Sequence, residues 1–201
     1  MLNVSVASKL SNGQMLVVAK DSRTPNNPKE YYYRQYLQTM LHELVHMASS
    51  LFDKNTGIVL SGFDKYPSAN INEQNTGLNE GYTELITEKY FGTLDEKDDD
   101  YRYEVIVAKC LERIIGEEKL ENLYINANLK GLINEFTKYL SNKDTLSFIN
   151  RLDYICDNRF KNELSNYQEY KIIQYIKEIN NTLITMYIDK LKKDNLDNYT
   201  F

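Results

Sequence analysis

Two histidines lie four positions apart in the segment LHELVHMASS, and they are the only histidines of the 201-residue chain. A glutamate, Glu43, directly follows the first of them. On a helix, positions i and i+4 share one face, so His42 and His46 can direct two imidazole nitrogens at one point. Zinc binds neutral imidazole, and a catalytic zinc site uses three protein ligands and keeps a fourth position for water. The spacing therefore predicts a zinc site in which Glu43 takes a proton from that water.

Chance is a poor explanation for this pattern. Two histidines placed at random would show this spacing, with a glutamate after the first, in about one chain in a thousand. The polar residues of the expected helix also share a face, opposite its apolar one: Gln35, Thr39, His42, His46 and Ser49. The alternative is a pair of ordinary helix histidines that bind nothing.

A third ligand must come from elsewhere, because two ligands do not make a catalytic zinc site. With no further histidine in the chain, it must be a carboxylate, a thiolate or a tyrosine. The downstream segment TGLNEGYTELITEKYFG contains Asn79-Glu80-Gly81-Tyr82-Thr83. That stretch resembles the N-E-G-F-A sequence of the gluzincin aminopeptidases, and Asn79-Glu80 followed by Glu84 resembles the N-E-x-x-x-D of thermolysin-like peptidases.

The resemblance to the gluzincins implies specific roles for two glutamates. Glu80 would be the third zinc ligand, rather than a solvated helix glutamate. Glu84, one helical turn later, would accept a hydrogen bond from a ligand histidine and so fix its tautomer and orientation. Glu88, one further turn along, could compete for that second role. The resemblance spans roughly residues 33–91 and no other part of the chain.

The chain departs from the gluzincin pattern at two points. Thermolysin-like enzymes stabilise the transition state with a downstream histidine, which this chain lacks. As in the aminopeptidases, a tyrosine could instead donate to the developing oxyanion. Tyr103 is the first candidate, followed by Tyr82 and Tyr66, although each could simply pack. The gluzincins also carry a larger β-sheet before the zinc helix, where this chain has room for little more than a hairpin.

The elements around these motifs predict an α+β fold with a mainly helical, zincin-like body. VSVASKL and QMLVVAK flank Asn12-Gly13, which is typical of a hairpin turn. Its second strand, residues 14–20, could offer an edge to an extended peptide. Asn27, Pro28 and Glu30 mark a helix start. That helix should run to about Phe52, and a second one from about residue 77 to 91.

We expect a single domain with three parts. These are a β element over residues 1–27, the zinc-binding helices and their connecting loop over 28–91, and a helical C-terminal subdomain over 92–201. The acidic run LDEKDDD between the second and third parts is typical of a solvated turn. Cys110 and Cys156 are far apart, form no C-x-x-C pair, and are expected to be free thiols.

Composition narrows the range of partners. The net charge is −5 and the basic residues are scattered, which argues against nucleic acid, because phosphate binding needs a clustered basic face. No apolar run approaches the roughly 18 residues of a membrane span, and we see no signal peptide. We therefore expect a cytoplasmic protein of unspecified oligomeric state whose partner is a peptide or protein substrate.

The sequence thus favours a zinc-dependent metallopeptidase with Glu43 as general base. A first alternative is a zincin-like protein that keeps the metal but acts as a binding or regulatory module. A second is a helical interaction module in which the histidine motif is accidental and no metal binds. Nothing in the sequence identifies a side-chain pocket, and the lack of an exopeptidase motif in the first 41 residues slightly favours an endopeptidase.

Overall fold

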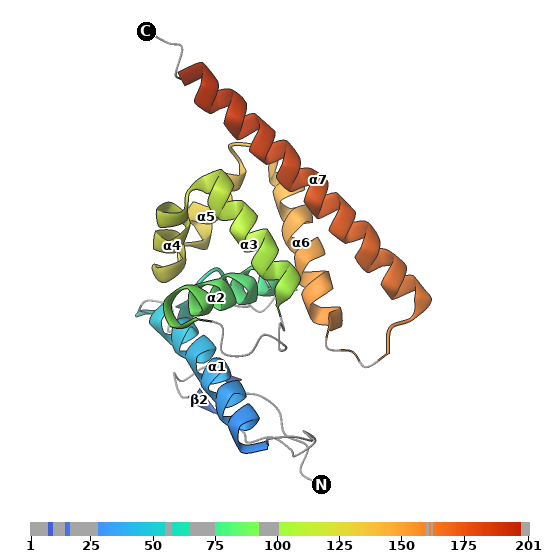
Figure 1. The fold of residues 1–201 in the computed structure, drawn as a ribbon. Helices are drawn as coiled ribbons and strands as arrows, with labels where there is room; N and C mark the ends of the chain where they lie inside the picture. Colours follow the sequence, from blue (N-terminus) through green and yellow to red (C-terminus); the bar gives the residue numbers. More distant parts are fainter. Residues whose placement is uncertain are drawn as a thin grey trace.

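The computed structural model consists of seven helices and two short antiparallel strand pairs in the part of the chain that it describes (Figure 1). The described backbone comprises residues 8–9, 15–16, 28–54, 58–64, 75–92, 101–159, 161 and 163–197. This mainly helical architecture with small antiparallel sheets is compatible with the α+β class predicted from the sequence.

The first strand pair joins β1 (Ser8–Lys9) to β2 (Met15–Leu16). Ser8 faces Leu16 and Lys9 faces Met15 in antiparallel register, as a hairpin over this segment requires. The predicted Asn12-Gly13 turn lies outside the described residues. So does most of the strand expected over residues 14–20, and the peptide-binding edge expected there stays a prediction.

Helix α1 (Pro28–Ala48) begins at the proline that the sequence pattern indicated but ends earlier than residue 52. The predicted end was wrong because the chain turns directly into strand β3 (Ser50–Asp53), which pairs with β4 (Ile58–Ser61). The carbonyl of His46 accepts hydrogen bonds from three serine hydroxyls at 2.6 to 3.1 Å, those of Ser49, Ser50 and Ser61. Serine hydroxyls that take a helix carbonyl compete with continuation of the helix.

Helix α2 (Thr76–Phe91) matches the second predicted helix and lies at the centre of the molecule, where it packs against α1, α3 and α6 (Figure 1). Two of its glycines allow neighbouring helices to pack closely against it. A Cβ at Gly77 would lie 2.8 Å from the carbonyl oxygen of Leu152, and one at Gly81 would lie 2.5 Å from the Cβ of Glu104. Glycine at these positions therefore sets how closely α3 and α6 approach α2.

The C-terminal part is helical, as predicted, and a break at Ala127 and Asn128 separates two of its helices. Ala127 adopts the left-handed conformation with φ 47°, and the Asn128 side chain accepts the Gly131 N–H at 2.8 Å to start the next helix. The helices of this part are α3 (Arg102–Ile115), α4 (Glu117–Ile125), α5 (Leu129–Phe136), α6 (Asn142–Arg159) and α7 (Asn166–Asp197).

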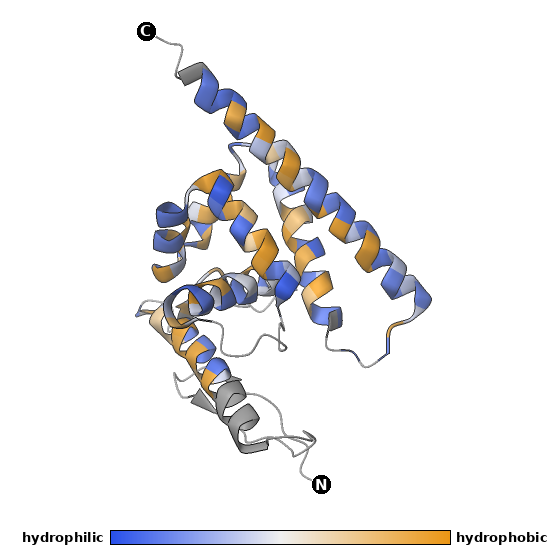
Figure 2. Ribbon diagram, viewed as in Figure 1, coloured by the Kyte–Doolittle hydropathy of each residue, from blue (hydrophilic) through white to orange (hydrophobic). Residues whose placement is uncertain are grey.

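The hydrophobic core lies where α2, α3, α4 and α6 meet, around side chains with no exposed surface such as Leu78, Tyr82, Leu111 and Tyr124. Apolar and polar residues alternate along α7 (Figure 2), which buries Ile179. In the described part of the chain, no helix is both long enough and apolar enough to span a membrane. Cys110 and Cys156 are free, as predicted.

Candidate metal centre

Helix α1 presents both histidines toward α2 on one face. The Nε2 atoms of His42 and His46 lie 3.1 Å apart, and the two ring centroids are 4.8 Å apart. Both side chains are buried, with residue exposures of 7% and 6%. The i, i+4 spacing therefore brings two imidazole nitrogens to one point, as predicted.

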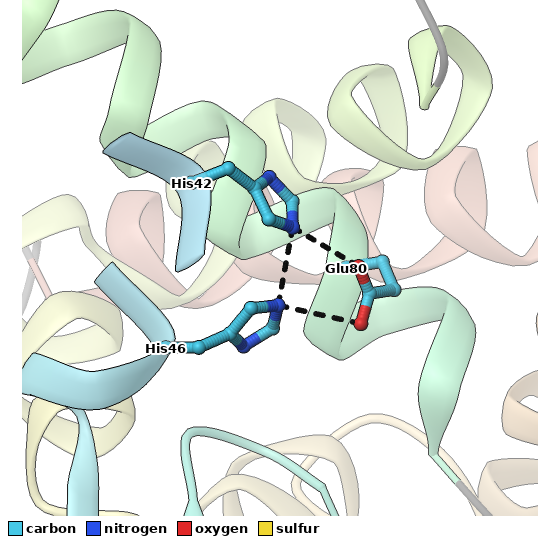
Figure 3. A group of neighbouring side chains, drawn as sticks. All are labelled: His42, His46 and Glu80. Carbon is cyan, nitrogen blue, oxygen red and sulfur yellow. Dashed lines mark hydrogen bonds and ion pairs between the residues drawn. The ribbon is translucent and has the colours of Figure 1, made fainter. Parts of the chain in front are cut away.

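The Glu80 carboxylate, carried on α2, meets this point (Figure 3). Its Oε2 lies 3.1 Å from Nε2 of His42, and its Oε1 lies 3.4 Å from Nε2 of His46. One ligand atom from each of the three residues falls within 4.8 Å of the other two. The structure thus juxtaposes the three residues that the sequence named as metal ligands, from two helices separated by a long connection.

Glu84 lies behind the first histidine, one helical turn after Glu80. Its Oε2 accepts a hydrogen bond from Nδ1 of His42 at 2.7 Å, and its Oε1 accepts one from the side chain of Gln38 at 2.7 Å. This is the contact that the resemblance implied for Glu84. Glu88, the competing candidate, instead pairs with Lys109 on the outer surface at 3.0 Å.

The second histidine is held differently. Nδ1 of His46 lies 3.3 Å from the hydroxyl of Thr83, which is fully buried on α2 between Glu80 and Glu84. The Thr83 hydroxyl in turn contacts the Asn79 carbonyl at 2.7 Å and the Tyr124 hydroxyl at 2.5 Å. One histidine is therefore backed by a carboxylate and the other by a hydroxyl.

The positions of the hydrogens on the His42 ring show that the three ligand atoms suit a cation. Because Nδ1 of His42 donates to a carboxylate, its neutral ring presents a bare lone pair at Nε2. That lone pair faces the Glu80 carboxylate and the second imidazole nitrogen, an arrangement of electron-rich atoms that favours a cation among them. Two imidazole nitrogens and one carboxylate oxygen are a donor set that zinc accepts.

In the metal-free chain a proton takes the cation's place. Burial by itself lowers the pKa of His42, but hydrogen bonds with Glu80 and Glu84 outweigh burial and raise that pKa to about 10. Burial raises the pKa of Glu80, but its electrostatic interaction with His46 and its hydrogen bond with His42 hold that pKa well below its ordinary value. A metal ion would displace this shared proton.

Glu43 is buried beside the histidine pair, with 8% of its surface exposed. It follows His42 on α1 and so points about 100° around the helix axis from it. Its burial distinguishes it from a solvated surface glutamate, and its catalytic role stays a prediction.

The tyrosines proposed from the sequence take other positions. The Tyr103 hydroxyl lies against α7, 3.3 Å from the carbonyl of Ile176 and 3.2 Å from the side-chain oxygen of Asn180. Tyr82 is buried in the core and its hydroxyl lies 3.1 Å from Glu112. Tyr66 lies outside the described residues.

A tyrosine that the sequence reasoning did not select contacts the site. Tyr101, just before α3, stacks on the His42 imidazole with ring centroids 5.6 Å apart and ring planes 15° apart. Tyr103, the tyrosine predicted for this role, belongs to the same YRY segment, in which no periodic pattern distinguishes the two tyrosines. Thr83 was also missed, although it lies inside the quoted motif and shares a helix face with Glu80.

The turn after β4 is hydrogen-bonded to α2 next to the site. The Phe63 N–H donates to the Asn79 side chain at 2.9 Å, directly before Glu80. Gly62 makes this possible, since its φ is 54° and a Cβ there would lie 2.4 Å from both Asn79 and the Tyr124 ring. Asn79 in the N-E-G motif therefore links the turn after β4 to α2.

Comparisons with protein-family models, with curated proteins and with solved structures give no match to this chain.

Proposed function

We propose that the chain is a zinc-dependent peptidase of the gluzincin type. The observation that carries the proposal is the convergence of His42, His46 and Glu80, with ligand atoms within 4.8 Å of one another. Zinc bound by these residues would polarise a substrate carbonyl and acidify a water at neutral pH. The contact between Glu84 and His42 adds support, because carboxylates commonly orient the histidine ligands of zinc.

In this proposal Glu43 moves the proton. Its carboxylate accepts a proton from water as the water oxygen bonds to the carbonyl carbon of the peptide. When the C–N bond breaks, the same carboxyl group donates that proton to the leaving amine. The burial of Glu43 supports this role, since limited contact with bulk water keeps the transferred proton at the site.

Tyrosine is the residue type proposed to stabilise the transition state. The stacking of Tyr101 on His42 makes Tyr101 the first phenol to test, ahead of Tyr103, whose hydroxyl contacts α7. The substrate class is a peptide or protein.

The test is turnover of a mixed peptide library by the zinc-loaded chain, with cleavage products identified by mass spectrometry. Glu43→Gln should keep the zinc but lose at least about 100-fold in turnover, because the amide cannot accept the proton. Glu88→Gln is the matched control, since it removes an outward-facing carboxylate that pairs with Lys109. Cleavage by Glu43→Gln at the native rate would remove Glu43 from the mechanism.

The second candidate is a zinc-binding module with little hydrolytic activity. It is favoured by the absence of any third histidine from the chain. If the chain is such a module, the variants above should bind zinc with the affinity of the native chain. Neither the variants nor the native chain should then cleave the peptide library. Together, zinc binding and library turnover distinguish the two proposals, and a chain that binds no zinc contradicts both.

A further inference from the structure

The Thr83 hydroxyl makes more contacts than a threonine inside a helix needs. A threonine in a helix interior can satisfy its hydroxyl with the carbonyl four residues earlier. Thr87, equally buried and one turn further along α2, makes such a bond to the Thr83 carbonyl at 2.8 Å. Thr83 makes the equivalent bond to the Asn79 carbonyl, and its oxygen also lies within reach of His46 and Tyr124.

Counting protons fixes the direction of each bond. A threonine hydroxyl has one hydrogen and two lone pairs. Its hydrogen goes to the Asn79 carbonyl at 2.7 Å, so the Thr83 oxygen must accept from its other two partners. On this count Tyr124, whose hydroxyl also contacts Ser49, donates its O–H to Thr83, and Nδ1 of His46 donates a hydrogen to the same oxygen.

Tyr124 is well suited to donate its hydroxyl hydrogen to Thr83. Its side chain on α4 has no exposed surface and packs against Phe63 and Tyr82, with ring centroids 5.3 and 5.0 Å away. Burial raises the pKa of this phenol above its ordinary value, so it keeps its proton. A phenylalanine could fill the same aromatic space, so packing does not account for the hydroxyl.

We propose that Thr83 and Tyr124 form a hydroxyl relay that holds His46 with its proton on Nδ1 and its Nε2 lone pair facing Glu80. Both are positioning residues, because they act on the site through His46. The use of this geometry for zinc rests on the function proposed above, whereas the tautomer itself is a property of the metal-free chain.

The relay also explains why the two histidines have different partners. Three carboxyl groups already lie at the site, those of Glu80, Glu84 and the buried Glu43. A further carboxylate behind His46 would add another buried charge, and burying an unbalanced charge is costly. A neutral hydroxyl fixes the ring without that cost, and the donation from Tyr124 leaves Thr83 just one lone pair, which His46 fills.

The test is the ¹⁵N NMR spectrum of the His46 ring in metal-free protein in mildly alkaline solution, paired with zinc affinity measured by competition with a chelator. In the native chain neutral His46 should carry its proton on Nδ1. Thr83→Val should lose this preference and weaken zinc binding about 10- to 100-fold, the range for partners of metal ligands. Thr83→Ser, which restores the hydroxyl, should recover both, and Tyr124→Phe should show a smaller loss.

Thr87→Val is the matched control, since it removes a buried hydroxyl from the same helix and should leave both readouts native. The relay is overturned if native His46 carries its proton on Nε2, or if Thr83→Val behaves like Thr87→Val. Should Thr83→Val fail to fold, an unchanged ring spectrum and zinc affinity in Tyr124→Phe would overturn it equally. Neither readout uses turnover, so a chain that binds zinc and cleaves nothing would contradict the peptidase proposal and leave the relay standing.

Discussion

At the scale of single residues, the site is defined by which atoms carry protons. The Nδ1 of His42 donates to Glu84, and both Nε2 atoms face the Glu80 carboxylate at 3.1 and 3.4 Å. In the metal-free chain a proton occupies this space, and hydrogen bonds with Glu80 and Glu84 raise the pKa of His42 to about 10. A zinc ion bound as proposed would therefore compete with this proton for the same atoms.

Zinc affinity should consequently rise with pH. Below about pH 10 His42 is protonated in the metal-free chain, so each zinc bound releases a proton, and affinity should increase about tenfold per pH unit across the neutral range. Chelator competition at several pH values measures this slope. The same shift makes a stabilising contribution to the metal-free fold that is full below pH 6.5 and is lost as pH rises through about 10. A zinc affinity independent of pH would contradict the shared-proton account.

Tyr101 offers a second test at this scale. Tyr101→Phe keeps the ring that stacks on His42 and removes only the hydroxyl. If this phenol donates to the transition state, turnover of a cleaved peptide should fall by about 100-fold or more while zinc affinity stays native. Tyr103→Phe is the control, because that hydroxyl contacts α7. A larger loss of turnover in the control would return the role to Tyr103.

At the scale of elements, two helices form the site and their close packing sets its geometry. Helix α1 supplies both histidines and α2 supplies Glu80, while α3 crosses α2 at Gly81, directly beside Glu80. The glycine of the N-E-G motif therefore has a steric function. It lets the backbone of α3 approach α2 where a larger residue would separate them.

Gly81→Ala tests this packing. An added Cβ would lie 2.5 Å from the Cβ of Glu104 and 2.6 Å from its carbonyl carbon, so α2 and α3 must move apart. Overpacking of this kind costs about 1–3 kcal/mol of unfolding free energy, which urea denaturation measures. Zinc affinity should fall as well, since Glu80 shifts with the helix. If Gly81→Ala unfolds at the same urea concentration as the native chain, this contact does not limit how closely α2 and α3 approach.

Local sequence patterns predicted some boundaries of the helices and strands correctly and others wrongly, and the difference has physical reasons. The start of α1 was predictable because Pro28 marks it locally, and the histidine pair followed from helical spacing alone. The end of α1 was not, because residues 50–53 form a strand only through pairing with residues 58–61. Glu80 and Glu84 were selected through a resemblance to a motif, whereas Tyr124 reaches Thr83 from a distant helix and leaves no local pattern.

At the scale of the whole molecule, the central position of α2 links the site to the core. It packs against α1, α3 and α6, and the N-terminal Gly77 N–H donates to Asp153 of α6 at 2.8 Å. Burial raises the pKa of Asp153 to about 7, and the nearby carboxylates of Asp157 and Asp64 add to the shift. A charged carboxylate there satisfies the helix terminus but is costly to bury.

Asp153 should make the stability of the whole fold depend on pH. Its folded pKa lies above the ordinary value of 3.8, so its contribution is full below pH 3.8 and is lost as pH rises through about 7. Asp153→Asn keeps an acceptor for Gly77 and removes the charge. In urea denaturation with chelator present, the variant should gain stability relative to the native chain as pH rises from about 5 to 8. A difference that stays constant over this range would contradict the assignment.

The most direct test of the metal centre is the zinc content of the purified chain by mass spectrometry, compared with Glu80→Ala and Glu88→Ala. The two glutamates lie on the same helix, but only Glu80 faces the histidines, whereas Glu88 pairs with Lys109. We predict about one zinc per chain for the native protein and for Glu88→Ala, and clearly less for Glu80→Ala. A native chain that binds no zinc even with excess metal, or equal zinc in all three proteins, would contradict the proposed centre.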